Sequence, residues 1–445
     1  MNQADEVLSL SYLDIQHDAI TVFDDVEQGI VQKEDIWISS YLHGQDSVHD
    51  KARVEFGKVG GVSFNAGDDI QVERISKVDF LVDVPLHDIK KRPVHFPRHA
   101  ENPSYRQSTD IGAPSRINTL SINPKTAQIV IGSDDGYCMI LPTTVNASHN
   151  HNGVKLQGHV GDVRCVKWFP SGEVVLTASS DFSIRVFGLT GVNPRTFRGH
   201  TRTVTSLAII DIGKQILSGS QDGTIRLWDI AKDEEIKQWP VEGSGVKGLL
   251  LVEEAATLLA LGLEGQERAA LAQTREGIWV QPTYGKGWMV FTQDQVESFA
   301  YEKQTGTIAM GFINGVIEVR EATTLAKNPS GKKQKLRRNE SAILSLAFAP
   351  KIADDQEIFL YIGTAAGLPC RLGVKSTEDS YQIETRDELA GWDAVGIACI
   401  EIGNNGVWCG GDDGSLKSSD VVPNSKIADL PLVNAGGEQL EIVVP

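Results

Sequence analysis

Three residue types that could form a hydrolytic triad lie close together in the segment GHTRTVTSLAIIDIGKQILSGSQDGTIRLWD (199–229). They are His200, Ser218 and Asp222. In a serine hydrolase, a buried Asp orients the His that takes the proton of the Ser nucleophile. These residue types alone would therefore allow acyl-transfer chemistry. Whether they form a catalytic triad depends on the elements that position them.

A second copy of the pattern argues against catalysis. In residues 158–187, His159, Thr177 and Asp181 stand at the same offsets of 18 and 22 residues from the His. The Ser and the Thr each fall inside an apolar, strand-like run. A repeated structural device explains both copies, whereas a catalytic triad explains neither the repetition nor the Trp228 that follows. We therefore predict no catalytic residue in either copy.

The same turn recurs seven times at intervals of about 46 residues, and an alternating apolar strand precedes each copy. A period near this length with Gly-His and Trp-Asp marks is typical of WD repeats in a β-propeller with four strands per blade. The sequence thus predicts an all-β fold containing a seven-bladed WD-repeat β-propeller. The seven turns are SDDG (133–136), SSDF (179–182), SQDG (220–223), REG (275–277), ING (313–315), AAG (365–367) and GDDG (411–414).

Within this architecture the residues of the 199–229 segment gain a structural role. We expect Asp222 to accept a hydrogen bond from His200, the imidazole to contact Ser218, and Ser218 to contact the Trp228 indole. In the preceding unit Phe187 replaces the Trp and has no N–H, so that network is expected to be one bond shorter.

Residues 1–110 lack the repeat and are predicted to form a separate, small, acidic β-rich domain, with residues 111–445 forming the propeller. AITVF (19–23) is among its predicted strands, and the polar segment 87–114 is interpreted as a connector. Either this connector or the tail LEIVVP (440–445) could supply the strand that closes the ring.

The sequence contains one basic run, GKKQKLRR (331–338). It is interpreted as a solvated inter-blade loop, with a nuclear-import or acidic-partner patch as the alternative.

The charge of the chain limits its partners. The net charge is −17, and residues 1–50 hold eleven Asp or Glu against Lys33 alone. This balance argues against nucleic acid and anionic membranes as partners and favours a basic protein partner, unless the acidity serves solubility alone.

The clustered histidines do not form a metal-binding motif. His87, His95 and His99 lack carboxylate or thiolate partners at metal-binding spacing, so no metal or cofactor is predicted. With no signal peptide and no membrane segment, a cytoplasmic and nuclear location is expected.

Propellers bind partners on one rim of loops, and offsets from the repeated turns predict which side chains point there. Four of these side chains are carboxylates, and three are arginines that stand among them. The predicted partner-binding residues are Asp134, Asp162, Glu297, Asp412, Arg116, Arg164 and Arg275.

Residues 158–229 resemble the proteasomal ATPase-associated factor family. The likeness is carried by FPSGEVVL (169–176) and IIDIGKQILSGSQDGTIRLWD (209–229), with Phe182 and Phe187 as departures from the family pattern. The resemblance implies a non-catalytic chaperone, monomeric when alone, for assembly of the proteasome regulatory particle. Such proteins bind the C-terminal domain of an ATPase subunit and leave before the mature particle forms.

Two other classes remain as alternatives. Substrate receptors of cullin-type ubiquitin ligases frequently carry Trp-Asp-x-Arg, but here Trp228-Asp229 is followed by Ile230 and Ala231. A generic WD-repeat scaffold in signalling or trafficking is the second alternative. An enzyme with this fold would need convergent polar groups in the central channel, and the sequence does not reveal them.

Overall fold

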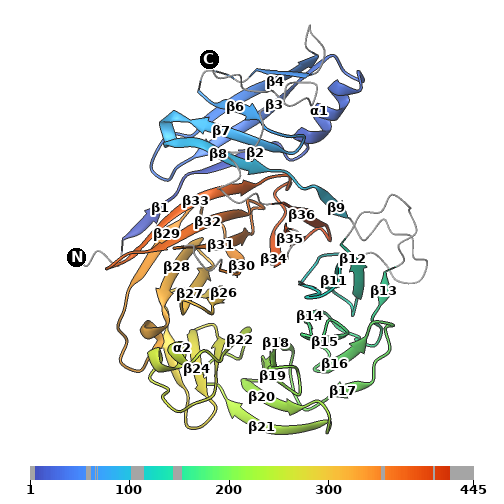
Figure 1. Cartoon of the computed structure of the whole chain (residues 1–445), viewed down its shortest axis with the longest axis vertical. Helices are drawn as coiled ribbons and strands as arrows, with labels where there is room; N and C mark the ends of the chain where they lie inside the picture. Colours follow the sequence, from blue (N-terminus) through green and yellow to red (C-terminus); the bar gives the residue numbers. More distant parts are fainter. Residues whose placement is uncertain are drawn as a thin grey trace, which may run out of the picture.

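Seven antiparallel sheets stand side by side around a ring in the computed structural model (Figure 1). The structure describes residues 6–56, 62–65, 67, 69–101, 115–143, 153–351, 356–403 and 406–420. In each sheet the first strand is innermost, and neighbouring strands of the blade are antiparallel. The sequence prediction of an all-β propeller is confirmed.

The first four blades each use four consecutive strands of the chain. They are β10 (Thr119–Ile122), β11 (Gln128–Gly132), β12 (Cys138–Pro142) and β13 (Val154–Lys155); β14 (Val163–Trp168), β15 (Val174–Ser179), β16 (Ile184–Gly188) and β17 (Arg195–Phe197); β18 (Val204–Ile210), β19 (Gln215–Ser220), β20 (Thr224–Asp229) and β21 (Glu234–Pro240); and β22 (Gly248–Val252), β23 (Ala269–Gln273), β24 (Gly277–Pro282) and β25 (Trp288–Phe291).

The last three blades gain strands from the N-terminal part of the chain. Their own strands are β26 (Val296–Glu302), β27 (Thr307–Phe312), β28 (Val316–Glu321) and β29 (Lys333–Arg337); β30 (Ile343–Phe348), β31 (Glu357–Thr364), β32 (Cys370–Ser376) and β33 (Tyr381–Leu389); and β34 (Ile397–Gly403), β35 (Gly406–Gly411) and β36 (Leu416–Ser419).

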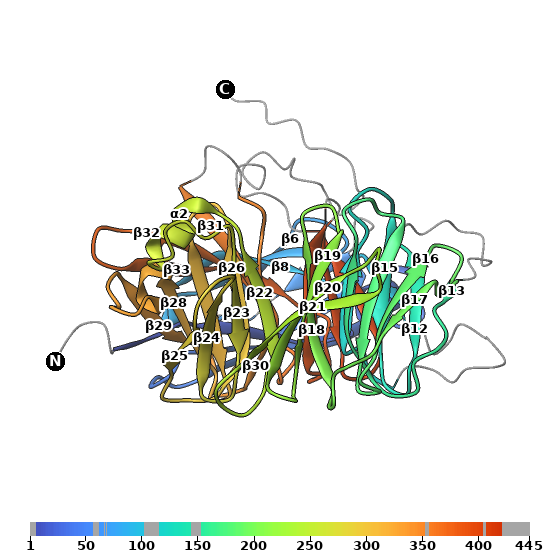
Figure 2. The ribbon, with the colours of Figure 1, turned by 90° about the horizontal axis from the view of Figure 1, so that it is seen from below.

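The apolar core lies between neighbouring blades. Leu176 and Ile184 of blade two share one buried cluster with Leu207 and Trp228 of blade three. Because each sheet buries both faces against its neighbours, no blade can remove its apolar surface from water by itself. Figure 2 shows the ring from the side, with α2 (Ala255–Ala260), which joins β22 to β23, on the upper face.

The N-terminal residues form a second core beside the ring. The sheet order there is β2-β3-β4-β5, and α1 (Ala19–Glu27) packs against β3 and β4. The helix buries Ala19, Val22, Phe23 and Val26, a spacing that places them on one helical face. The prediction of a strand at 19–23 is therefore wrong, because this helical spacing outweighs the β-propensity of Ile, Thr and Val. The strands are β2 (Tyr12–Ile15), β3 (Lys33–Tyr41), β4 (Val48–Phe56) and β5 (Val62–Asn65).

Three N-terminal strands complete propeller sheets, so the predicted boundary at residue 110 does not separate the contacts of the two regions. β1 (Val7–Ser9) pairs in parallel with β29 of blade five. β8 (Ile89–His95) pairs in parallel with β33 of blade six. It continues that blade into a seven-stranded sheet through β7 (Asp79–Val84) and β6 (Gln71–Arg74). β9 (His99–Glu101) forms the outer strand of blade seven beside β36.

The predicted connector at 87–114 therefore contains two strands, and its backbone hydrogen bonds go to propeller edges. The interpretation as a connector is wrong for β8, which belongs to a sheet, while β9 is the closing strand that the connector was expected to be able to supply. Residues 102–114 lie outside the described residues. β9 supplies the outer strand of blade seven, one of the two options that the sequence left open. The tail 440–445 lies outside the described residues. Within the described ranges no helix is long and apolar enough to span a membrane.

The basic run 331–338 is the outer strand of blade five, which corrects its interpretation as a loop. β29 pairs with β28 on one side and with β1 on the other. Its charges have partners: Lys332 lies 3.5 Å from Glu321, and Arg338 forms an ion pair with Glu388 of blade six. Within β29 the basic residues Lys333, Lys335 and Arg337 share one face, and the other face holds Gln334 and Leu336. With a single apolar residue, the strand lacks the apolar alternation that identifies strands in sequence.

A buried ionic cluster joins the N-terminal region to blade six. His95 of β8 lies 2.8 Å from Asp79 Oδ1 and 3.2 Å from Asp387 Oδ1. Arg371 pairs with Asp387, and Arg98 lies 3.0 Å from Asp79. Burial alone would lower the pKa of His95, but hydrogen bonds and the charges of both carboxylates raise it to about 9. At neutral pH the protonated imidazole therefore lies between two buried carboxylates, and Arg371 and Arg98 supply further positive charge to the cluster.

The stability of this junction should fall as pH rises. Because the folded pKa of His95 exceeds its ordinary value of 6.5, its contribution is complete below pH 6.5 and is lost as pH passes about 9. We expect the free energy of unfolding to fall by about 1–3 kcal/mol between pH 6.5 and 9.5. His95→Gln should remove this pH dependence. Urea denaturation of both proteins across this range tests it, and equal pH profiles would contradict it.

Candidate functional site

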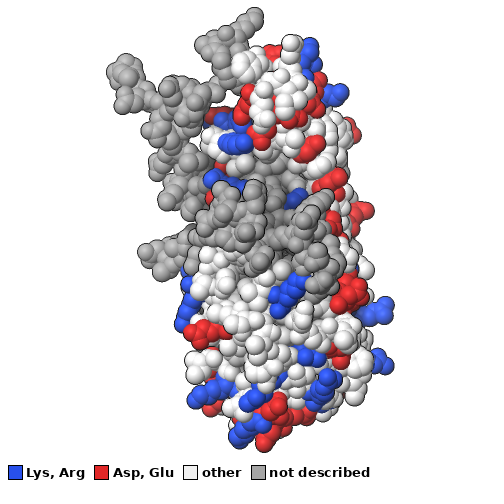
Figure 3. Space-filling view, turned by 90° about the vertical axis from the view of Figure 1, so that its right-hand side faces the viewer, with Lys and Arg blue, Asp and Glu red and all other residues white. Residues whose placement is uncertain are grey.

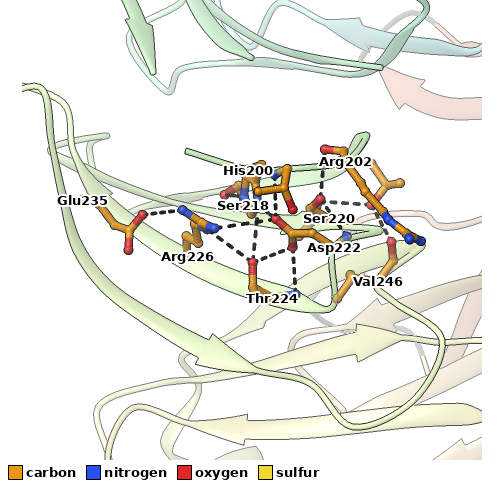
Figure 4. Close-up of polar contacts among 12 residues, drawn as sticks. His200, Arg202, Ser218, Ser220, Asp222, Thr224, Arg226, Glu235 and Val246 are labelled. Atoms are coloured by element: carbon orange, nitrogen blue, oxygen red, sulfur yellow. Dashed lines mark hydrogen bonds and ion pairs between the residues drawn. The ribbon is translucent and has the colours of Figure 1, made fainter. Parts of the chain in front are cut away.

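The His–Ser–Asp combination of blade three forms a buried chain of hydrogen bonds (Figure 4). The chain ends on the indole of Trp228. His200 Nδ1 lies 2.8 Å from Asp222 Oδ2, and His200 Nε2 lies 2.7 Å from Ser218 Oγ. Trp228 Nε1 donates to the same Ser218 oxygen at 2.8 Å. The chain ties the loop before β18 and the turn after β19 to β19 and β20, so it fixes the blade end that carries the rim.

The protons of this chain can be assigned. Burial lowers the pKa of His200, despite its bond to Asp222, so the imidazole is neutral at pH 7. Burial raises the pKa of Asp222, but hydrogen bonds from Thr224 and His200 outweigh it, so the carboxylate is ionised. Nδ1–H then donates to Asp222, and Ser218 Oγ–H donates to Nε2.

As in the triad of a serine hydrolase, the Ser donates to the His and the His donates to the Asp. However, Ser218 is 0% exposed. Its oxygen is enclosed by the His200 ring and the Trp228 indole, so no substrate can reach it. The chain is a structural lock.

Blade two has the same lock without the hydrogen bond from an indole N–H. His159 Nδ1 lies 2.9 Å from Asp181 Oδ2, and His159 Nε2 lies 2.7 Å from Thr177 Oγ1. Phe187 replaces the indole and presents its ring to His159 edge-on at 6.4 Å between centroids. Hydrogen bonds from His159 and Ser183 hold the pKa of Asp181 far below its ordinary value, although burial opposes them.

Two of the four predicted rim carboxylates already have cationic partners. Asp412 lies 2.8 Å from Arg116 Nη2, an ion pair that joins blade seven to blade one. Glu297 lies 3.3 Å from Lys247 Nζ and joins blade five to blade four. The rim therefore neutralises part of its own charge, a pairing between blades that sequence offsets could not reveal.

The other two carboxylates accept hydrogen bonds from neutral groups. Asp134 accepts from Asn118 Nδ2 at 2.9 Å and from Ser115 Oγ at 2.8 Å. Asp162 Oδ1 accepts from the backbone N–H of Asp135 at 3.3 Å. None of these three Asp residues forms an ion pair with a described Lys or Arg.

The two remaining predicted residues do not join these pairs. Arg164 on β14 and Arg275 in the turn before β24 are exposed. Neither forms an ion pair within the described part of the chain. Acidic and basic side chains are interspersed over the side of the molecule shown in Figure 3. This side of the molecule is therefore not uniformly acidic.

The innermost strands hold a charged pair that the sequence analysis missed. Glu401 of β34 accepts from Ser121 Oγ at 3.4 Å, and burial raises its pKa while the charge of Lys167 on β14 lowers it. Desolvation by the surrounding strands would lower the pKa of Lys167, but the charge of Glu401 raises it. The ring geometry brings these residues near each other, although they belong to the second and the seventh blade.

In the described residues no group of three or more His, Cys, Asp or Glu could hold a metal ion.

Replacing Asp222 should destabilise the fold without touching the partner surface. Asp222→Ala leaves the buried His200 without its acceptor, and we expect the free energy of unfolding to fall by about 1–3 kcal/mol. Glu173→Ala, which removes an exposed carboxylate from the neighbouring blade, is the matched control and should change it by less than about 0.5 kcal/mol. Urea denaturation measures both. Lost partner binding with unchanged stability in Asp222→Ala would make Asp222 a contact residue instead.

Known proteins share part of this sequence. The family model for the WD domain, G-beta repeat, matches residues 151–188 and 191–229. The 26S proteasome regulatory subunit RPN14 of Saccharomyces cerevisiae is 39% identical over 88 residues, 20% of each chain. Periodic tryptophan protein 2 of Arabidopsis thaliana is 34% identical over 19% of this chain and 10% of its own. WD repeat and FYVE domain-containing protein 1 of Mus musculus is 25% identical over 43% of this chain and 50% of its own.

These matches span at most half the length of the three relatives. The matched WD segments contain both His–Asp locks, and the fold around them is a ring of seven blades, each with at least four strands. The chain thus carries WD repeats within an all-β propeller.

Proposed function

We propose that this protein is a non-catalytic assembly chaperone that binds the C-terminal domain of an ATPase subunit of the proteasome regulatory particle. The observation that carries the proposal is the partial match to a 26S proteasome regulatory subunit, together with the family resemblance of residues 158–229. A propeller with buried His–Asp locks supports a role in protein binding, because its polar networks stabilise blades and leave the rim free for contacts.

The rim charges support a basic partner at blades one and two. Asp134 and Asp162 have no cationic partner in the described residues, whereas Glu297 and Asp412 already have one. An incoming Lys or Arg would gain more from the first pair, since it would not compete with an existing ion pair. We therefore place the electrostatic part of the contact at Asp134 and Asp162.

The second candidate is a WD-repeat scaffold outside the proteasome. The 25% identity to WD repeat and FYVE domain-containing protein 1 covers more of this chain than the match to the proteasome subunit does. A scaffold of this kind would use the same rim, but it would not select ATPase domains. The binding experiment therefore separates the two candidates.

Reversing charge at blades one and two should slow association. The variant Asp134→Lys/Asp162→Lys should bind the target ATPase domain with an association rate at least about tenfold lower at low salt. Its melting temperature should fall only slightly, because these two carboxylates are half-buried and have no ion-pair partner among the described residues. The wild-type rate should itself fall with salt, since the screening length is about 8 Å at physiological ionic strength.

Surface plasmon resonance with the separate C-terminal domains of the regulatory-particle ATPase subunits measures these rates. Glu173→Lys/Glu264→Lys is the matched control. It makes the same charge change in connections between first and second strands, at the other face of the ring. Salt-independent association with wild-type rates in the double reversal would contradict the electrostatic contact. A wild-type protein that binds none of the domains would contradict the chaperone function.

A further inference from the structure

The turn between the second and third strands of blade two contains a strained aromatic residue. At this position the other six blades have glycine, and five of those glycines have φ between 71° and 78°. Blade two instead has Phe182, with φ of 68°. A side chain beyond Cβ is disfavoured in this left-handed region, and for a bulky residue such a φ is an outlier. The six glycines are Gly136, Gly223, Gly277, Gly315, Gly367 and Gly414.

Nothing in the described structure compensates for this strain. Phe182 is 45% exposed, and its ring makes no aromatic or cation–π contact with another described residue. Its backbone N–H donates to Ser179 O at 3.2 Å, a bond that glycine would make equally well. Strained residues that persist without an internal reason are concentrated at binding and functional sites.

A second exposed apolar side chain lies next to this turn. Val160 is 86% exposed, and its backbone N–H donates to Asp181 Oδ2 at 3.3 Å, so the residue adjoins the one that precedes Phe182. Both residues belong to the rim end of blade two, where the His159 lock fixes the backbone on which they stand. We call these two residues the Val160–Phe182 patch.

The charges around the patch differ on its two sides. Toward blade one lie Asp134, Asp135 and Asp162, and the turn at Gly136 touches the backbone of His159 and Val160. Arg164 and Arg202 are exposed on the rim of blades two and three. The unpaired carboxylates of the rim thus border the patch on its blade-one side.

We propose that the Val160–Phe182 patch is the apolar centre of the partner contact. The occupant is an ATPase C-terminal domain that presents an apolar hollow with Lys or Arg on the side facing Asp134, Asp135 and Asp162. Interfaces of this kind derive most of their affinity from a few central, desolvated side chains, and aromatic residues are enriched among them. This inference rests on the proposed function and assigns it a contact centre that a charge argument alone does not give.

Replacing Phe182 by glycine separates binding from folding. Phe182→Gly removes the side chain and supplies the residue that this φ favours, so the melting temperature should stay the same or rise. The dissociation constant for the target ATPase domain should increase at least about tenfold, mostly through faster dissociation. Val160→Ser should weaken binding in the same direction without changing the melting temperature.

Ile313→Ser is the matched control, because Ile313 is 51% exposed in the corresponding turn of blade five. It should leave the dissociation constant within about twofold of the wild type. Calorimetric titration with the isolated ATPase C-terminal domains gives the affinities, and thermal unfolding gives the stabilities. Wild-type affinity in both Phe182→Gly and Val160→Ser would overturn the inference and leave the proposed function standing. A wild-type protein that binds none of the domains would overturn the proposed function and this inference with it.

Discussion

The ring is completed by a strand that precedes the first blade in the chain. β9 pairs with β36 over three residues, Glu101 opposite Leu416, Ala100 opposite Lys417 and His99 opposite Ser418. Just before β9, the backbone of Arg98 donates to Ser418 O, and its guanidinium lies 3.1 Å from Asp420 and 3.0 Å from Asp79. Blade seven and the N-terminal region are thereby joined at one place, and every blade relies on neighbours that this junction holds in position.

Polar groups in this protein fall into two kinds that do different work. Buried networks such as His200–Ser218–Asp222 and His95–Asp79–Asp387 hold backbone segments together and are closed to solvent. Rim groups are accessible, and some are already paired between blades while others are not. In the contact that we propose, the rim acquires its selectivity from this difference, because an unpaired carboxylate beside an exposed apolar patch offers a partner more than a carboxylate inside an ion pair.

The sequence predicted the features that depend on local spacing. Turn residues, alternating strands and the His–Asp offsets all repeat along the chain. The propeller and its locks could therefore be inferred from the amino-acid sequence alone. The ion pairs Arg116–Asp412 and Lys247–Glu297 could not, because each joins residues from different blades whose distance depends on ring geometry. β29 and β8 were also missed, because Lys, Arg and Pro interrupt the apolar alternation in strands whose charges are neutralised by distant partners.

Blade seven combines strands that are far apart in the sequence, so the ring can close only at a late stage of biosynthesis. β9 leaves the ribosome before blade one, while its partner β36 is translated about 300 residues later. At about 5–20 residues per second this interval lasts roughly 15–60 seconds. During this time the N-terminal region and six blades form an open arc in which β9 has no partner strand and each end blade exposes one apolar face. The nascent protein must therefore keep one strand edge and two apolar faces from joining other chains, and only the last blade ends that exposure.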